Sequence, residues 1–193
     1  MEKVKLRDLA EIRSGYSFRK KVTNNVNGDV SIIQMRDLIH DYTDIKGKKD
    51  LFKVSSTDLK KGHLLKQGDI LFLAKGTNNK AIVFKKKYEA IATLTFFIIS
   101  INQNKKNKFL PSYLAWYINQ DEAQRYFEKV LVGTSQRNIN SNSLRELEIP
   151  ILSLEKQKII SELSKLIDRE NQLLDLLKEK KEILIRESLL KLF

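Results

Sequence analysis

The chain has 193 residues, which suits one domain of ordinary size or one domain with an extension. It contains no cysteine and only two histidines, so disulfide scaffolds, thiolate zinc sites and cysteine nucleophiles are excluded, and a histidine-rich metal site is not expected. The formal net charge of +12 suggests a polyanionic partner such as nucleic acid, with a solvated lysine-rich surface as the alternative.

The chain divides into two unequal parts. All seven glycines lie in the first 133 residues, and the 43 residues after Pro150 contain neither glycine nor proline, the two main helix breakers. From Leu154 to Phe193 there are nine basic and eight acidic residues, so the first 153 residues carry +11 of the net charge. We expect a basic domain at about 1–153 and a long helix at about 154–193.

The first part has the pattern of a mixed fold, and its expected class is α/β (mixed α+β). Pro111 suits the first turn of a helix, and the residue before Pro150 is biased away from helix. In chain order, apolar spacing and turn residues predict a helix at 5–13, strands at 30–35, 70–74, 80–84 and 90–100, helices at 109–119 and 121–131, a polar loop at 133–142 and an extended segment at 144–151.

The tail is amphipathic, with Ser153 as its expected N-cap. Apolar residues recur at gaps of three and four over more than four heptads, interrupted at Glu170 and Lys180. A helix of about 38 residues spans roughly 57 Å, whereas a 153-residue domain is about 30–35 Å across. Because no turn residue allows the helix to fold back on itself, we expect its stripe to contact a partner helix. The residues expected to line that contact are Ile159, Leu163, Leu166, Leu173, Leu177 and Leu184.

Three polar segments are candidates for contacts with DNA. Segment 14–21 sets aromatic rings among cations, segment 75–80 leaves a predicted strand, and segment 134–140 is dense in Ser, Gln, Arg and Asn. Asn and Gln can bond an adenine edge, whereas Arg and Lys can contact guanine or phosphate. For each segment, an ordinary turn, loop or core role is the alternative. The residues expected to contact DNA are Tyr16, Arg19, Lys20, Lys21, Lys75, Thr77, Asn78, Asn79, Lys80, Ser135, Gln136, Arg137 and Asn138.

The sequence contains no recognisable catalytic motif. The phosphate-binding GxxxxGK[ST] loop, GxGxxG, HExxH and GxSxG are all absent. Asp69 and Glu89 precede predicted strands, and we interpret them as turn residues rather than as members of a two-metal nuclease site. We therefore expect no catalytic residue and no metal ligand in this chain.

Four segments, in order, resemble the specificity (S) subunit of type I restriction–modification systems. VKLRDLAEIRSGYSFR at 4–19 looks like the opening of a target recognition domain, and GDILFLAKG at 68–76 looks like its central strand. GTSQRNINSNSLRELEIPILSLEKQKII at 133–160 is similar to the closing signature that leads into a spacer helix, and SLLKLF at 188–193 looks like the end of that helix. The sequence departs locally at Leu152-Ser153, where many relatives have Pro-Pro. It also departs in length, because family members usually carry two recognition domains and two spacer helices.

The resemblance implies a non-catalytic subunit that reads one half of a bipartite double-stranded DNA target. It implies that the spacer helix pairs antiparallel with a partner helix and docks methyltransferase subunits, and restriction subunits where they exist. S-adenosylmethionine, ATP and Mg are then expected only in the partner subunits. A chain with one domain and one helix is expected to form a homodimer, whose two-fold symmetry predicts a palindromic bipartite target.

Other functions stay open at this stage. The chain is alternatively a truncated or regulatory copy that pairs with a full-length S subunit, a basic coiled-coil interaction protein without sequence-specific DNA binding, or a divergent metal-dependent nuclease. No signal peptide and no run of 18 apolar residues is visible, so we expect a cytoplasmic protein without a membrane partner.

Overall fold

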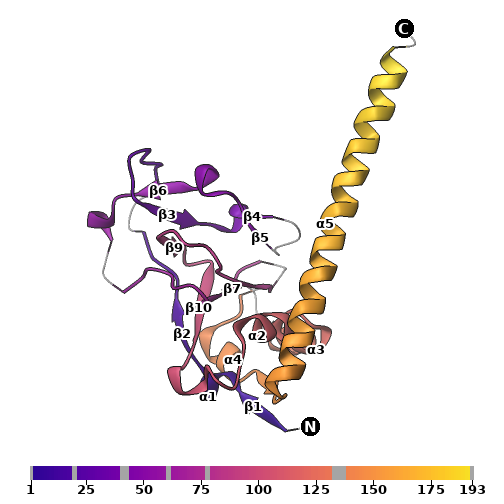
Figure 1. Ribbon diagram of the computed structural model, residues 1–193. Coiled ribbons are helices and arrows are strands. Elements are labelled where there is room, and N and C mark those ends of the chain that lie inside the picture. The colour runs from indigo at the N-terminus through magenta and orange to yellow at the C-terminus, as the bar shows by residue number, and fades with distance from the viewer. Residues whose placement is uncertain are drawn as a thin grey trace.

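The computed structural model describes residues 2–18, 21–39, 44–59, 62–76, 79–131 and 138–191. A domain of small sheets and short helices is followed by one long helix that projects from it (Figure 1). The mixed α and β fold class with a long C-terminal helix is therefore confirmed.

A four-stranded antiparallel sheet lies at the centre of the domain. Both of its faces are buried, which explains why the central Ile-Leu-Phe-Leu run is apolar throughout rather than alternating. Ile70 and Phe72 belong to a core shared with the helices, whereas Leu71 and Leu73 face a second core on the other side. In sheet order, the strands are β2 (Ala10–Ser14), β10 (Phe96–Ile101), β7 (Ile70–Leu73) and β8 (Ala81–Val83).

Three smaller sheets surround the central one. Parallel pairing occurs only between β3 and β9 among the described strands, and the other ladders are antiparallel. The sheets are β6 (Phe52–Val54), β3 (Val30–Ile33) and β9 (Ala90–Ala92); β4 (Leu38–Ile39) with β5 (Asp44–Ile45); and β1 (Lys3–Lys5) with β11 (Glu148–Pro150).

The helices cover one side of the central sheet. The Tyr113 hydroxyl donates a hydrogen bond of 2.9 Å to the carbonyl of Pro150, and burial raises the pKa of Tyr113 to about 12. This bond connects α2 to β11, the strand that leads into the long helix. The helices are α1 (Leu6–Leu9), α2 (Pro111–Ile118), α3 (Asp121–Leu131), α4 (Ser141–Arg145) and α5 (Leu154–Leu190). Short 3₁₀ helices lie at Met35–Asp37, Lys48–Asp50, Ser56–Asp58 and Gln103–Lys105.

Several predicted elements are corrected by the structure. The helix expected at 5–13 ends at Leu9, and Ala10–Ser14 forms β2 instead because its backbone pairs with β10. The strand expected at 90–100 is two strands, separated by a turn at Thr93–Thr95. The extended segment expected at 144–151 begins as the last turn of α4 and becomes strand only at Glu148.

The long helix begins where the sequence predicts. The Ser153 hydroxyl accepts the backbone N–H of Lys156 at 3.4 Å, as expected of an N-cap. The first turns of α5 pack on α2, where the Ser112 hydroxyl donates to the Ser161 hydroxyl at 2.9 Å. The C-terminal half of α5 stands clear of the domain (Figure 1).

Candidate nucleic-acid interface

Two of the three predicted DNA-contacting segments, 14–21 and 75–80, leave the central sheet at the same end. At that end β2 finishes at Ser14, β7 finishes at Leu73, β8 starts at Ala81 and β10 starts at Phe96. The register confirms the alignment, because Phe97 lies opposite Ser14 and Phe96 lies opposite Leu73. Loops at one end of a rigid sheet are a common place for binding residues.

Backbone hydrogen bonds connect the first and second segments through the turn between β9 and β10. The Tyr16 N–H donates to the carbonyl of Ala92 at 2.7 Å, and the Ala74 N–H donates to the carbonyl of Thr95 at 2.9 Å. The Thr93 and Thr95 hydroxyls lie 2.8 Å apart, within the same turn. This turn therefore fixes the positions of the starts of segments 14–21 and 75–80 relative to each other.

The second and third segments meet directly. Lys75 and Asn138 form an isolated antiparallel bridge, and the Ile139 N–H donates to the carbonyl of Ala74 at 2.9 Å. The side chains of Lys75 and Asn138 are both exposed, whereas Ile139 is buried. Two segments far apart in the sequence thus present polar residues side by side.

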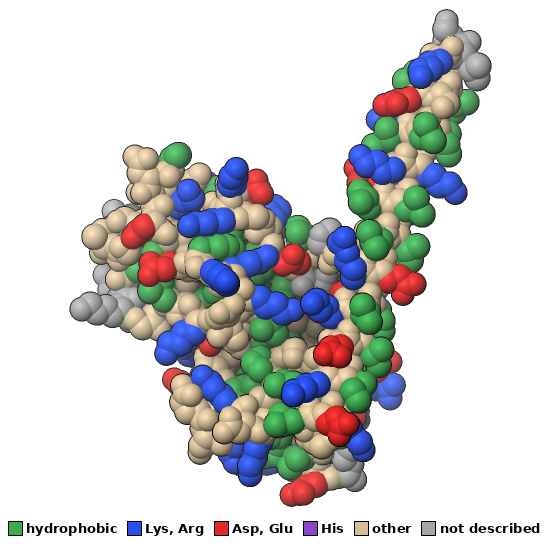
Figure 2. All heavy atoms as spheres, in the orientation of Figure 1, with side chains coloured by type: hydrophobic (Ala, Val, Ile, Leu, Met, Phe, Trp, Pro, Cys, Tyr) green, Lys and Arg blue, Asp and Glu red, His purple; other side chains and the backbone are tan. Residues whose placement is uncertain are grey.

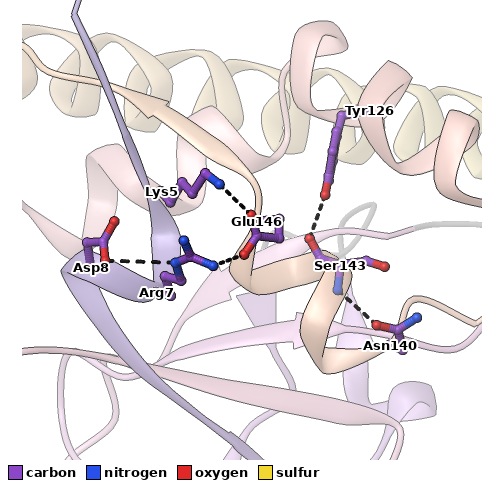
Figure 3. Close-up of polar contacts among 7 residues, drawn as sticks. All are labelled: Lys5, Arg7, Asp8, Tyr126, Asn140, Ser143 and Glu146. Atoms are coloured by element: carbon purple, nitrogen blue, oxygen red, sulfur yellow. Dashed lines mark hydrogen bonds and ion pairs between the residues drawn. The ribbon is translucent and has the colours of Figure 1, made fainter.

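The end of the third segment is fixed to the body of the domain (Figure 3). The Asn140 side chain accepts the Ser143 N–H at 2.8 Å and caps α4, while the Tyr126 hydroxyl donates to the Ser143 carbonyl at 2.8 Å. Lys5 and Arg7 both form ion pairs with Glu146, just after α4. Anchoring of this kind lowers the conformational entropy that a loop loses when it binds a ligand.

The close approach at Gly15 explains why the first segment begins with a residue that has no side chain. A Cβ atom built there would lie 2.0 Å from the Thr93 carbonyl oxygen and 2.8 Å from the Ala92 carbonyl oxygen. Both neighbours are backbone atoms, so they cannot move aside as a flexible side chain would. Glycine at this position is what allows Tyr16 to hydrogen-bond to Ala92.

Tyr16 is partly buried. Its ring makes edge contacts with Phe18, at 4.8 Å between centroids, and with His63, at 5.0 Å, and it packs against the small core of Val30, Ile32 and Ile91. These contacts favour the packing role over base stacking, and a contact of Tyr16 with DNA stays a prediction. Lys21 follows this aromatic pair and is exposed.

Asn79 does not lie on the surface. Its side chain is only 4% exposed, and its Nδ2 donates to the carbonyl of Leu73 at 3.1 Å. Because the amide closes the turn between β7 and β8, the expectation that Asn79 reads a base is corrected. Lys80, the next residue, is partly exposed and lies beside Ala81, whose backbone is held by the Asn119 side chain at 2.7 and 2.9 Å.

Seven of the residues expected to contact DNA lie outside the described residues: Arg19, Lys20, Thr77, Asn78, Ser135, Gln136 and Arg137. The candidate residues that the structure describes do not all lie in one place. Lys75 and Asn138 are brought together at the sheet end, Tyr16 is connected to the same end by its backbone, and Lys21 and Lys80 lie farther along their segments.

Comparison with known proteins decides the family. A family model described as the type I restriction modification DNA specificity domain matches residues 1–184. The chain belongs to this family. Because the match runs past Leu154, it includes most of α5 as well as the domain. No curated protein matches the sequence significantly.

Three solved structures resemble this type I specificity domain. One comes from a study of complex assembly and conformational transition of the type I R-M system, with 15% identity, a TM-score of 0.66, and coverage of 94% of this chain and 41% of that chain. The HsdS subunit from Thermoanaerobacter tengcongensis has 17% identity and a TM-score of 0.60, over 90% of this chain and 38% of that one. The type I S subunit from M. genitalium has 13% identity and a TM-score of 0.57, over 98% and 44%. At these identities the likeness shows the fold, and the chain spans about two-fifths of the length of each.

A cleft of about 400 Å³ lies between β8, α2 and α5 of this specificity domain. Lys80 and Lys85 line it together with Asp168 and Asp175. Burial raises the pKa of Asp168, and the positive charge of Lys85 partly opposes that shift. Lys165 also lines the cleft, so three lysines and two aspartates leave its lining with little net positive charge. The sheet end is therefore the better candidate for an interface with a DNA backbone.

The ranges that the structure describes contain no group of three or more His, Cys, Asp or Glu residues that could hold a metal ion. No helix in the same ranges has both the length and the apolar content needed to cross a membrane. Asp69, interpreted as a turn residue, is 4% exposed, and its carboxylate accepts bonds from Ser100 Oγ at 2.7 Å and the Lys66 N–H at 2.9 Å.

Gln157 is a residue whose role sequence reasoning missed. Its side chain is fully buried: Oε1 accepts the Leu110 N–H at 2.9 Å, and Nε2 donates to the carbonyls of Lys108 and Leu152 at 2.8 and 2.9 Å. The closing signature of the specificity domain contains this glutamine, but its spacing alone does not show that the amide fastens α5 to the entry of α2.

We expect Gln157→Ala to lower the free energy of unfolding by about 2–4 kcal/mol, because it empties a fully buried site and three partly buried backbone groups lose their partner. Chemical denaturation measures this loss. Lys158→Ala is the matched control, since Lys158 is exposed on the same turn and its replacement is expected to change stability by less than about 0.5 kcal/mol. An unchanged midpoint for Gln157→Ala would show that these hydrogen bonds do not fasten the helix.

Proposed function

We propose that this chain is a DNA specificity subunit of a type I restriction–modification system and that its domain reads one half of a bipartite target. The observation that carries the proposal is the meeting of polar segments at one end of the central sheet in a chain of this family. The +11 charge of the first 153 residues supports it, because phosphate contacts supply much of the affinity of DNA-binding proteins. Lys and Arg side chains spread over the visible face of the domain (Figure 2).

In this proposal the chain positions other subunits and catalyses nothing itself. Methylation and cleavage belong to methyltransferase and restriction subunits, which bind S-adenosylmethionine, ATP and Mg. The absence of recognisable catalytic motifs from the sequence supports this division. The domain at about 1–153 contacts DNA, and the helix at about 154–193 contacts protein.

The proposal includes a homodimer formed through α5. The chain spans 38–44% of the solved chains it resembles, so two copies together approach their length. The apolar residues expected to line the partner contact are exposed in the single chain, from 48% for Leu173 to 65% for Leu166. Hydrophobic side chains are visible along α5 in Figure 2. A two-fold dimer of recognition domains would read a palindromic bipartite sequence.

Light-scattering mass, measured for the protein alone and after mixing with the methyltransferase subunit of the same system, tests the proposal. We expect a mass near twice 22.5 kDa for the protein alone and a larger complex with the methyltransferase. Sequencing of the methylated sites would then give the target. A monomer that captures no methyltransferase would contradict the proposal and favour a truncated or regulatory copy that pairs with a full-length S subunit.

A further inference from the structure

Two lone charges interrupt the apolar surface of α5. Glu170 and Lys180 are both exposed, and neither has an ion-pair partner in the described part of the chain. Side chains three and four residues away are the neighbours of a helical residue, and here all of them are apolar. They are Leu166, Ile167, Leu173 and Leu174 around Glu170, and Leu176, Leu177, Ile183 and Leu184 around Lys180. The helix itself therefore offers neither charge a partner of opposite sign.

Part of the apolar pattern of α5 is symmetric about Asp175. Counting outward from Asp175, positions at equal distances on the two sides are both apolar in five cases. At five residues from the centre, Glu170 on one side matches Lys180 on the other. The matching apolar pairs are Leu174 with Leu176, Leu173 with Leu177, Ile167 with Ile183, Leu166 with Leu184, and Ile160 with Leu190, although Ile160 itself packs against the core of its own domain.

This symmetry has a direct meaning for two identical helices. When two copies lie antiparallel about a two-fold axis, each residue on one side of the axis lies opposite the residue at the same distance on the other side. In that arrangement α5 therefore matches apolar with apolar at these five pairs, whereas Leu163 lies opposite Glu187 and Ile159 lies opposite Lys191. With the axis at the level of Asp175, each Glu170 lies opposite a Lys180 of the second copy.

The face concerned points away from the domain. Gln157, Ser161 and Asp168 are among the least exposed residues of α5, and they face α2 and β8. At about 100° per residue, Leu163, Leu166 and Leu173 lie on the opposite side of the helix. A second helix can therefore lie along α5 without meeting the domain of the first chain.

We infer that two copies of this chain pair through α5 in one antiparallel register, with Glu170 of each copy facing Lys180 of the other across a two-fold axis at Asp175. This inference rests on the proposed function and deepens it, because it adds the register in which the two copies of α5 pair. It also assigns the choice of register to one charge pair, which occurs twice in the dimer.

Other alignments leave the charges unmatched. A parallel pair in register brings Glu170 against Glu170 and Lys180 against Lys180, which is repulsive. Shifting the antiparallel pair by one heptad places Glu170 opposite Leu173 and Lys180 opposite Leu163, so both charges lie among apolar side chains without compensation. The register centred on Asp175 places Glu170 opposite Lys180, and it keeps Leu173 opposite Leu177 and Leu166 opposite Leu184.

Cross-linking tests the register, because the chain has no cysteine of its own. We expect a mixture of Glu170→Cys and Lys180→Cys proteins to form a covalent dimer when treated with a short thiol-reactive cross-linker. Each variant alone should not, since two copies of residue 170 lie about 15 Å apart along the axis of this dimer. Self-cross-linking of Glu170→Cys alone would show a parallel pair and overturn the inference.

Charge reversal supplies a second measurement that does not depend on cysteine chemistry. Glu170→Lys and Lys180→Glu, each alone, are expected to weaken the dimer roughly 10- to 100-fold, because two attractive pairs become repulsive. The double variant restores every pair and should recover wild-type affinity. In a parallel pair, the single variants would exchange one like-charge contact for another and leave affinity unchanged, which would contradict the inference.

Failure of the register and failure of the proposed function give different results. A dimeric wild-type protein whose 170/180 mixture does not cross-link would overturn the register and leave the homodimer intact. A protein that stays monomeric at all concentrations would overturn both the register and the homodimer. DNA retention of the wild-type protein, measured on the same samples, reports separately on the recognition domain.

Discussion

Replacing Lys21 and Lys75 together with alanine is expected to weaken DNA binding roughly 30-fold at about 0.15 M salt. Both side chains are exposed, and they belong to segments that leave the same end of the central sheet. Each phosphate contact that is lost also removes one released counterion, so the slope of log affinity against log salt should fall by about 2. Because phosphate contacts carry no base information, the loss should be similar for all DNA sequences.

Fluorescence anisotropy with a labelled duplex, repeated at several salt concentrations, measures both quantities. The matched control is Lys106→Ala with Lys108→Ala, which removes the same charge from exposed side chains just after β10, at the opposite end of the sheet. We expect this control to bind nearly as well as the wild type. If both pairs of substitutions weaken binding equally, net charge rather than the sheet end explains the affinity.

Leu173→Asp is expected to abolish the dimer at micromolar concentrations. Leu173 lies two residues from the centre of symmetry at Asp175, so the substitution removes two apolar contacts in the dimer and buries two unpaired carboxylates. The lost burial alone amounts to about 4 kcal/mol, which is roughly 1,000-fold in Kd. Sedimentation or light scattering should find a mass near 22.5 kDa, with the helical circular dichroism of α5 reduced but the domain folded.

Asn171→Asp is the matched control for this helix variant. It adds the same charge two residues away, at an exposed position that lines the cleft on the domain side of α5. We expect it to remain dimeric. A dimer that persists in Leu173→Asp would show that the apolar stripe does not form the interface.

The two experiments together separate the proposed function from its rivals. A basic coiled-coil interaction protein would lose its dimer in Leu173→Asp but would show no DNA binding above the weak non-specific level. Replacing Lys21 and Lys75 would then change its DNA affinity only slightly. A regulatory copy would retain DNA binding and pair more tightly with a full-length S subunit than with itself.

Local sequence patterns predicted the elements whose residues contact near neighbours. Pro111 starts α2 as expected of a proline at N1, and Ser153 caps α5. The Ile-Leu-Phe-Leu run forms β7, because a short apolar run after Gly-Asp suits a strand buried on both faces. These predictions succeeded because propensity, capping and burial act within a few residues.

The predictions that differ from the structure concern residues that pair with segments far away in the sequence. Residues 10–14 have helical spacing, yet they form β2 because the edge of β10 supplies a full ladder of hydrogen bonds. The strands β1 and β11 pair the start of the domain with its end, through Lys3 opposite Pro150, and neither segment has a pattern that indicates the other. Asn79 is a candidate for DNA contact by its residue type, but the structure buries its side chain, whose amide donates a hydrogen bond to the Leu73 carbonyl.

For this protein, the sequence alone predicts a basic, glycine-containing domain followed by a nearly neutral helix with an apolar stripe too long for that domain to bury. It also contains the motifs that resemble a specificity subunit. Composition and periodicity are enough for that, since they depend on which residues are present and how they are spaced. Only the tertiary structure shows that Tyr16, Lys75 and Asn138 belong to one sheet end, and that Gln157 fastens α5 to the domain. Those relations depend on strand register and buried hydrogen bonds between distant segments, which spacing along a single chain does not encode.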